Sequence, residues 1–307
     1  MNKAVLLVNL GSPDSTSVGD VRRYLNEFLM DRRVIDTPWL FRRFIVGTIL
    51  INRPKESAHA YEKIWTKEGS PLVVTSRNVR EKLAERTTVP VELAMRYQNP
   101  SIKDALCKLA GQKVDETLLI PLFPHYAMSS YETAVVQVQD LARKIAPGMK
   151  IVVQPPYGDA PDYVAALAAS AANHLEAGYD HLLFSFHGIP ERHLRKSDPT
   201  GGHCLATPGC CQTASPAQAT CYRAQCFQTV AAMVKQAPVL ANMGVAPVHA
   251  DTAGTTWDAV GVAGPLDRVP VGQGISDYYL TNPIARASET MAKCSREFSG
   301  TAKLAAE

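Results

Sequence analysis

The chain has 307 residues, of which 46% are hydrophobic and 20% are charged, and this composition excludes an intrinsically disordered protein. A chain of this length is expected to form two domains of ordinary size. Lys and Arg number 32 against 29 Asp and Glu, and a net charge of +3 without a basic run argues against a general nucleic-acid-binding protein. The basic excess lies in residues 1–55, where nine basic and five acidic side chains give a net charge of +4.

The apolar runs are too short for an export signal or a membrane span. Ala4–Val8 is shorter than the apolar region of a signal peptide. Trp39–Leu50 is the most membrane-like stretch, but Arg42 and Arg43 interrupt it, and a span needs about 20 apolar residues. We therefore expect a cytoplasmic protein. In it, Trp39–Leu50 forms an amphipathic helix that packs on the core or lies on the surface of the inner membrane.

The first 190 residues alternate between strand-like and helix-like segments. Apolar runs predict strands at 4–9, 91–96, 117–122, 150–154 and 181–186. Apolar residues at helical spacing predict helices at 18–30, 56–65, 78–85, 102–109, 131–145 and 160–177. Ser17 is a helix-start signal for the first of them. This alternation predicts an α/β fold with parallel sheets covered on both faces. Residues 236–275, rich in Gly, Pro and Ala, show no clear alternation.

Loops that follow apolar runs are the candidates for a functional site, because ligands bind at the carboxyl ends of parallel strands. Three such loops are Gly11–Pro13, Phe123–Ser130 and His187–Pro190. The sequence contains no G-x-G-x-x-G, P-loop, H-E-x-x-H or G-x-S-x-G motif. His187 is the strongest single candidate, since an imidazole at the sheet edge can accept a proton or bind a divalent metal near neutral pH. The alternative is a histidine that stabilises a turn. His193, nearby, is expected to be exposed.

Five of the seven cysteines fall within 23 residues: Cys204, Cys210, Cys211, Cys221 and Cys226. Cys107 and Cys294 are isolated and are expected to be small buried hydrophobic residues. In a reducing compartment, clustered thiols indicate a metal or an iron–sulfur cluster rather than disulfides. The spacing C-x5-C-C-x9-C-x4-C lacks the C-x2-C pairs of structural zinc sites, so a [2Fe–2S] cluster, a zinc ion and no metal remain alternatives. Adjacent Cys210 and Cys211 are not expected to reach one site together, which leaves one cysteine as a spare.

Six segments in order resemble the ferrochelatases, the enzymes that insert Fe2+ into a porphyrin to make haem. They are VLLVNLGSP (5–13), FLMDRRVID (28–36), RPKESAHAYEKIW (53–65), AMRYQNPSI (94–102), LIPLFPHYAMSSYET (119–133) and FSFHGIPERH (184–193). The resemblance covers about residues 1–235, and FSFHGIP is its most specific part. The insert HCLATPGCC…CYRAQCFQT is similar to that of bacterial ferrochelatases whose [2Fe–2S] ligands lie inside the chain. This implies a [2Fe–2S] cluster on four of the five cysteines between residues 204 and 226.

The resemblance implies two Rossmann-like, chelatase-type lobes with parallel sheets and a porphyrin in the cleft between them. An N-terminal lobe would span residues 1–155, and 156–235 would begin the second. His187 would take pyrrole protons or ligate the iron. The segments that line the family's porphyrin cleft contain Arg53, Tyr61, Arg96, Tyr97, Tyr126, Ser129 and Ser130. Their arginine and hydroxyl groups would hold the propionates of protoporphyrin IX or coproporphyrin III. Trp39–Leu50 is similar to the apolar lip at the cleft mouth.

The C-terminal part departs from this family. Ferrochelatases usually carry a glutamate facing the histidine, in a pattern like F-x-x-D-x-x-E-T-L, and that pattern is not found after about residue 235. Ser276–Cys294 instead resembles the C-terminal end of the large iron–sulfur subunit of NADH:quinone oxidoreductase. We therefore expect a divergent segment at 236–307 and an incomplete second lobe. The leading hypothesis is a ferrochelatase. The alternatives are a catalytically impaired porphyrin- or iron–sulfur-binding protein and a chelatase for another metal, such as cobalt.

Overall fold

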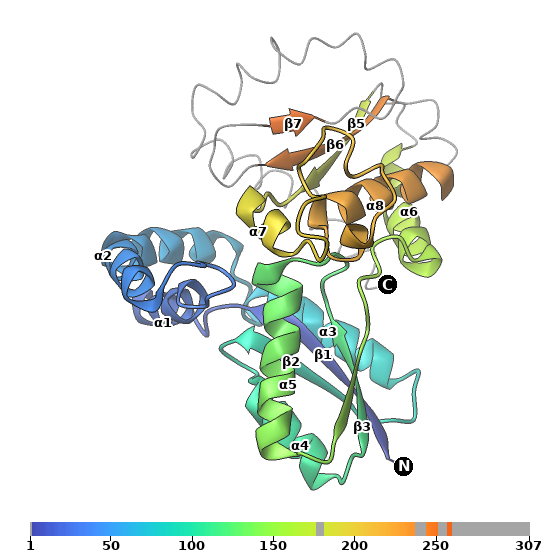
Figure 1. Cartoon of the computed structure of the whole chain (residues 1–307). Coiled ribbons are helices and arrows are strands. Elements are labelled where there is room, and N and C mark those ends of the chain that lie inside the picture. The colour runs from blue at the N-terminus through green and yellow to red at the C-terminus, as the bar shows by residue number, and fades with distance from the viewer. Residues whose placement is uncertain (1, 176–180, 237–243, 251–256, 260–307) are drawn as a thin grey trace. The chain divides into compact units, whose positions relative to one another are not determined.

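The computed structural model of the chain describes residues 2–175, 181–236, 244–250 and 257–259 (Figure 1). The chain divides into two compact units, Met1–Pro156 and Tyr157–Glu307. Both units are α/β, which confirms the predicted fold class. Within the described residues, no helix is long and apolar enough to cross a membrane.

A four-stranded parallel sheet forms the centre of the first unit, with strand order β2-β1-β3-β4. Its strands are β1 (Lys3–Gly11), β2 (Val91–Tyr97), β3 (Glu116–Pro121) and β4 (Lys150–Val153), at the positions that the apolar runs predict. The register pairs Leu7 with Leu93 on one side and with Ile120 on the other. Leu6, Leu7 and Val8 are almost fully buried, because both faces of the sheet are covered.

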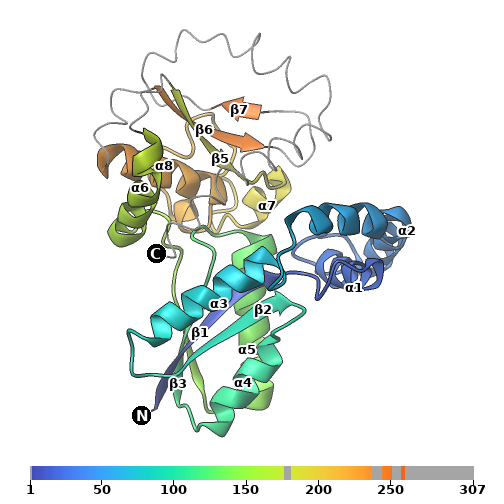
Figure 2. The ribbon, with the colours of Figure 1, turned by 180° about the vertical axis from the view of Figure 1, so that it is seen from behind.

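The helices of the first unit are α1 (Val18–Leu29), α2 (Trp39–Ile64), α3 (Pro71–Ala84), α4 (Ile102–Gly111), the π-helix η1 (Met128–Glu132) and α5 (Thr133–Ile145). Helix α3 covers one face of the sheet and α4 and α5 cover the other, whereas α1 and α2 pack on each other beside it (Figures 1 and 2). Leu106 of α4 and Val138 of α5 pack in one core cluster, whereas Val73 of α3 packs in another. Ser17 caps α1 by accepting a hydrogen bond from the Asp20 backbone N–H at 3.1 Å, as predicted.

Helix α2 differs from the prediction, because the helix expected at Trp39–Leu50 and the one expected at 56–65 are joined in a single helix of 26 residues. Pro54 lies inside it and is buried, so a residue that usually interrupts a helix is accommodated by packing. The first half of α2 leaves large apolar side chains in solvent, with Leu40 74% and Phe44 73% exposed. Arg42 is buried on the opposite side and donates to the carbonyls of Ile35 and Thr37.

The second unit contains a smaller sheet with strand order β5-β6-β7. Strands β5 (His181–Phe186) and β6 (Gly244–Ala250) are parallel, and β7 (Trp257–Ala259) pairs antiparallel with β6. Its helices are α6 (Pro161–Leu175), α7 (Glu191–Lys196), the 3-10 helix η2 (Pro216–Ala219) and α8 (Tyr222–Gln236). Helices α6 and α8 pack together, where Val164, Val230 and Met233 form a core with Phe184 and Phe186. Strands β6 and β7 lie in a region where the sequence showed no strand–helix alternation.

Candidate functional site

His187 directly follows β5, at the carboxyl end of the strand, as the sequence predicts. The residue is exposed to solvent, yet the protein that surrounds the ring partly desolvates it, and this lowers the pKa of the imidazole below its usual value of 6.5. A lowered pKa keeps the imidazole neutral at pH 7. His187 can therefore accept a proton and exchange it with water.

Four cysteines lie together in a buried cluster behind this loop. The cluster contains Cys204, Cys210, Cys211 and Cys221, packed with Leu194, Ala217 and Ala224. The sulfurs of Cys210 and Cys211 are 4.0 Å apart. The loop therefore turns tightly enough to bury these two adjacent thiols together.

Hydrogen bonds inside the cysteine cluster shift the pKa values of its thiols in different directions. A hydrogen bond from the Cys211 thiol, together with backbone N–H groups at the start of α8, lowers the pKa of Cys221 to about 6. The same hydrogen bond raises the pKa of Cys211, its donor. Burial, followed by the charge of Cys221, raises the pKa of Cys204 to about 12. The Cys211 thiol is therefore the donor, and the Cys221 sulfur the acceptor, of the hydrogen bond between them.

Polar side chains outside the cluster hold the cysteine loop in shape. Asp198 accepts hydrogen bonds from the backbone N–H groups of Cys204 at 2.8 Å and His203 at 2.7 Å, which hold the pKa of Asp198 far below its usual range. The His203 ring lies 2.8 Å from the carbonyl oxygen of Cys210, and Gln218 donates to the carbonyl of Cys211 at 3.0 Å. Each bond fixes the backbone at or next to a cysteine.

The donor set of this cluster fits an iron–sulfur group. It offers four thiol sulfurs in one buried group, and the Leu205 backbone N–H points at the Cys210 sulfur at 3.4 Å, the kind of contact that tunes cluster sulfurs. In the part of the chain that the structure describes, no group of three or more His, Cys, Asp or Glu side chains has the geometry to hold a metal ion.

Cys226 is buried as well, but it does not belong to the packing cluster that contains the other four cysteines. It stands one helical turn after Tyr222 on α8, and its sulfur accepts a hydrogen bond from the Tyr222 hydroxyl. Burial raises the pKa of Tyr222 well above its usual value, while a hydrogen bond from the His187 backbone acts in the opposite direction.

The residues predicted to bind the porphyrin lie in the first unit in two kinds of surroundings. Arg53 is exposed on α2 and pairs with Glu56 at 3.4 Å. Tyr61, on the same helix, is half-buried with its ring against Tyr24 and Trp65. Ser129 and Ser130 are half-buried in η1.

Arg96 and Tyr97, in contrast, belong to a buried polar group centred on Asp31. The Asp31 carboxylate accepts from Arg96 at 2.6 Å, from the Tyr97 hydroxyl at 3.0 Å and from the Thr133 hydroxyl. Tyr97 is completely buried, which favours a structural role over contact with a ligand. Tyr126 is held similarly, because its hydroxyl donates to Glu132 at 2.7 Å while Arg33 binds the other carboxylate oxygen at 2.8 Å.

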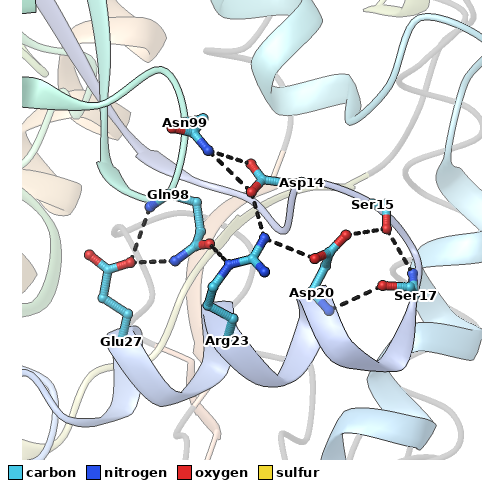
Figure 3. A network of polar contacts seen from close by, with 8 residues as sticks. All are labelled: Asp14, Ser15, Ser17, Asp20, Arg23, Glu27, Gln98 and Asn99. Carbon is cyan, nitrogen blue, oxygen red and sulfur yellow. Dashed lines mark hydrogen bonds and ion pairs between the residues drawn. The ribbon is translucent and has the colours of Figure 1, made fainter. Parts of the chain in front are cut away.

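Loops at the carboxyl edge of the first sheet are joined by a second, exposed network (Figure 3). Asp14, after β1, accepts from Arg23 of α1 at 2.7 Å and from Asn99, after β2, at 3.0 Å. Arg23 also donates to Gln98 at 2.8 Å, and Glu27 accepts from the Gln98 backbone N–H at 3.2 Å. Gln98 has a positive φ of 63°, a conformation that these contacts hold in place.

The ferrochelatase family model matches residues 2–249. The chain belongs to the ferrochelatase family. It is 56% identical to a ferrochelatase of Stutzerimonas stutzeri over 229 residues, which are 74% of this chain and 67% of that protein. It is 50% identical to a ferrochelatase of Opitutus terrae over 260 residues, 83% of this chain and 75% of the relative. A ferrochelatase of Pseudomonas fluorescens is 54% identical over 230 residues, 74% of this chain and 67% of that protein.

A second family, the C-terminal region of the G subunit of NADH-ubiquinone oxidoreductase, matches residues 245–294. This confirms the resemblance found at Ser276–Cys294 and extends it toward the N-terminus. The ferrochelatase match ends at residue 249, about 14 residues later than the motifs indicated, and includes most of β6. The residues searched for the family's glutamate lie mostly outside the described part of the chain.

The ferrochelatase fold also corrects two single-residue predictions. Cys107 is exposed on α4 rather than buried, because its side of the helix faces away from the sheet. His193 is buried rather than exposed, on the inner side of α7 beside Leu194. Sequence reasoning missed Asp31, Arg33 and Glu132, and their signal was present, since all three lie in segments that carry the family resemblance.

Proposed function

We propose that this member of the ferrochelatase family inserts Fe2+ into a porphyrin, with His187 as the residue that removes the pyrrole protons. The placement of His187 supports this most directly, because a neutral imidazole stands at the carboxyl end of a strand and in contact with solvent. The family match includes His187 and the segment FSFHGIP around it.

The reaction needs a base that can act twice. Two pyrrole N–H bonds break as four Fe–N bonds form, so haem formation releases two protons for each iron. A neutral imidazole accepts one proton from a pyrrole nitrogen, and its contact with water lets it pass that proton on before it accepts the second. The family's glutamate pattern is not found in the sequence, so His187 would carry out both transfers with solvent as the final acceptor. The absence of the glutamate pattern from the sequence also supports the alternative function, a porphyrin-binding protein with impaired catalysis.

For the porphyrin, we propose that α2 and η1 supply the binding groups. Arg53 is an exposed guanidinium that suits a propionate, and Tyr61, Tyr126, Ser129 and Ser130 offer hydroxyl groups. The exposed apolar side chains of α2, Trp39, Leu40, Phe41 and Phe44, suit an apolar macrocycle or the interface of a membrane. Peripheral contact with the inner membrane through Trp39–Leu50 is part of this proposal, as is a cytoplasmic location.

We also propose that Cys204, Cys210, Cys211 and Cys221 hold a [2Fe–2S] cluster, with Cys226 as the fifth, non-ligating cysteine. The burial of these four thiols in one group and the distinct surroundings of Cys226 support this choice. When bound, the cluster would cross-link the loop between α7 and α8 through four Fe–S bonds. Asp198, His203 and Gln218 would hold the backbone of that loop in either state.

Haem formation by the purified chain, measured anaerobically with Fe2+ and either protoporphyrin IX or coproporphyrin III, tests the function. We expect turnover with one of the two, and a loss of at least about 100-fold for His187→Ala, as for removal of a general base. His59→Ala is the matched control, because His59 is exposed on α2 and pairs with nearby Glu62 at 3.4 Å. Porphyrin binding without haem would favour the impaired alternative, and faster insertion of Co2+ than of Fe2+ would favour a chelatase for another metal. Full activity of His187→Ala would refute the role of His187.

A further inference from the structure

The loop that carries His187 is packed against the cysteine cluster. Ile189, two residues after His187, contacts the cluster as a partly buried apolar side chain, and Leu194 of α7 is one of its buried members. Thr220, just before Cys221, donates its hydroxyl hydrogen to the carbonyl of Ser197 at the end of α7. The segment from His187 to Ser197 therefore packs against one side of the cysteine cluster.

Tyr222 provides a direct link between the two. It is the first residue of α8 and directly follows Cys221, so the cysteine loop fixes where its side chain begins. Its phenol accepts the backbone N–H of His187 and is also hydrogen-bonded to the Cys226 thiol. The ring is half-buried and packs against the cysteine cluster, which restricts the movement of the phenol.

We propose that Tyr222 is a positioning residue for His187, fixed in turn by Cys226, so that the order of the cysteine loop sets the orientation of the imidazole. This inference rests on the role of His187 in the proposed function. The Tyr222 phenol restrains the backbone of His187, the residue that carries the imidazole. When that hydrogen bond is lost, the His187 backbone N–H loses its partner within the protein, and the His187 loop gains conformations in which the imidazole is displaced. The fifth cysteine thereby has a role that needs no metal.

The same link gives the cluster an effect on activity without any part in proton transfer. Four Fe–S bonds would immobilise Cys221, and Cys221 places Tyr222. Loss of the cluster would then loosen the His187 loop in the same way as loss of the phenol. Because both changes act through one contact, their effects on turnover should be less than multiplicative when combined.

Tyr222→Phe tests the proposal, because it removes the hydroxyl and keeps the ring. We expect kcat to fall about 3- to 10-fold, as for one hydrogen bond, with the KM for porphyrin changed less than about 2-fold. Hydrogen–deuterium exchange of peptides that cover residues 184–190 should be faster, while iron and sulfide content stays at the wild-type level. Tyr163→Phe is the control, since Tyr163 lies on α6 of the same unit and packs on Tyr157.

Unchanged exchange at residues 184–190 in Tyr222→Phe would overturn the proposal, and loss of the cluster in that variant would show a structural role instead. If Tyr222→Phe does not fold, Cys226→Ala supplies the second variant, with smaller changes in the same direction. If the wild-type chain forms no haem, the proposed function fails, whereas the exchange experiment still tests the link between Tyr222 and the His187 loop.

Discussion

The buried carboxylate of Asp31 should be among the most sensitive positions in the first unit. It is 3% exposed and pairs with an Arg96 side chain that is 12% exposed, at 2.6 Å. Removing one partner of such a pair leaves the other charge buried and costs about 3–5 kcal/mol. For a unit of this size, that corresponds to a decrease in melting temperature of about 6–20 °C for Asp31→Ala. The Tyr97 and Thr133 hydroxyls would also lose their acceptor, which moves the expected value toward the upper end.

Thermal unfolding at pH 7.5, followed by tryptophan fluorescence of the first unit, measures this effect. Burial tends to raise the pKa of Asp31, but hydrogen bonds from Thr133 and Arg33 and the charge of Arg96 lower it overall. The stabilisation is therefore complete above the unfolded pKa of about 3.9 and is lost as the pH falls through the lower folded pKa. Asp140→Ala, which breaks an exposed pair with Arg143, is the control. A decrease for Asp31→Ala no larger than that of the control would refute the reasoning.

Individual contacts lead to three further predictions. Gly11→Ala should destabilise the first unit by more than about 2 kcal/mol, because Gly11 has a φ of +109° and a Cβ there would lie 2.0 Å from the Tyr97 carbonyl oxygen. Gly148→Ala is the control and should be near neutral, since the space around Gly148 is open, and equal unfolding midpoints for the two variants would contradict the prediction. The kcat for haem formation should rise with pH through a pKa below 6.5 and be level above pH 7, because His187 acts as a neutral base with a lowered pKa. A midpoint of the kcat profile above pH 7 would contradict the role of His187 as the base. Cys226→Ser should keep the visible absorption of the cluster whereas Cys211→Ser should lose it, and the reverse result would reassign the ligands.

The strands and the position of His187 could be predicted from sequence because they depend on local patterns. The apolar run of β1 is buried on both faces, and β5 has a similar apolar run, so both stand out in the sequence without any knowledge of their neighbours. Helix α2 was predicted only in part, because Pro54 locally disfavours a helix and tertiary packing overrides that preference. Strand β6 has Gly244 and Pro247 within seven residues, which weakens its strand pattern.

The pairing of side chains within the buried groups depends on contacts between distant residues, so it could not be predicted from the sequence alone. Asp31 meets Arg96 and Thr133 across 65 and 102 residues, so no spacing rule reveals the group. The separation of Cys226 from the other four cysteines has the same origin, because the spacing of the five says nothing about which of them face Tyr222. The resemblance to ferrochelatases identified the segments, and the structure showed which side chains within them are buried.

Iron insertion by this chain, with His187 taking the protons, can be measured directly. The measurement is a single-turnover reaction of Fe2+ with porphyrin bound to the full chain, in weak buffer with a pH indicator. We predict two protons released for each haem formed, with both the proton release and the Soret change slowed together in His187→Ala. Bound porphyrin that yields neither haem nor protons with the wild-type chain would contradict both iron insertion and the role of His187.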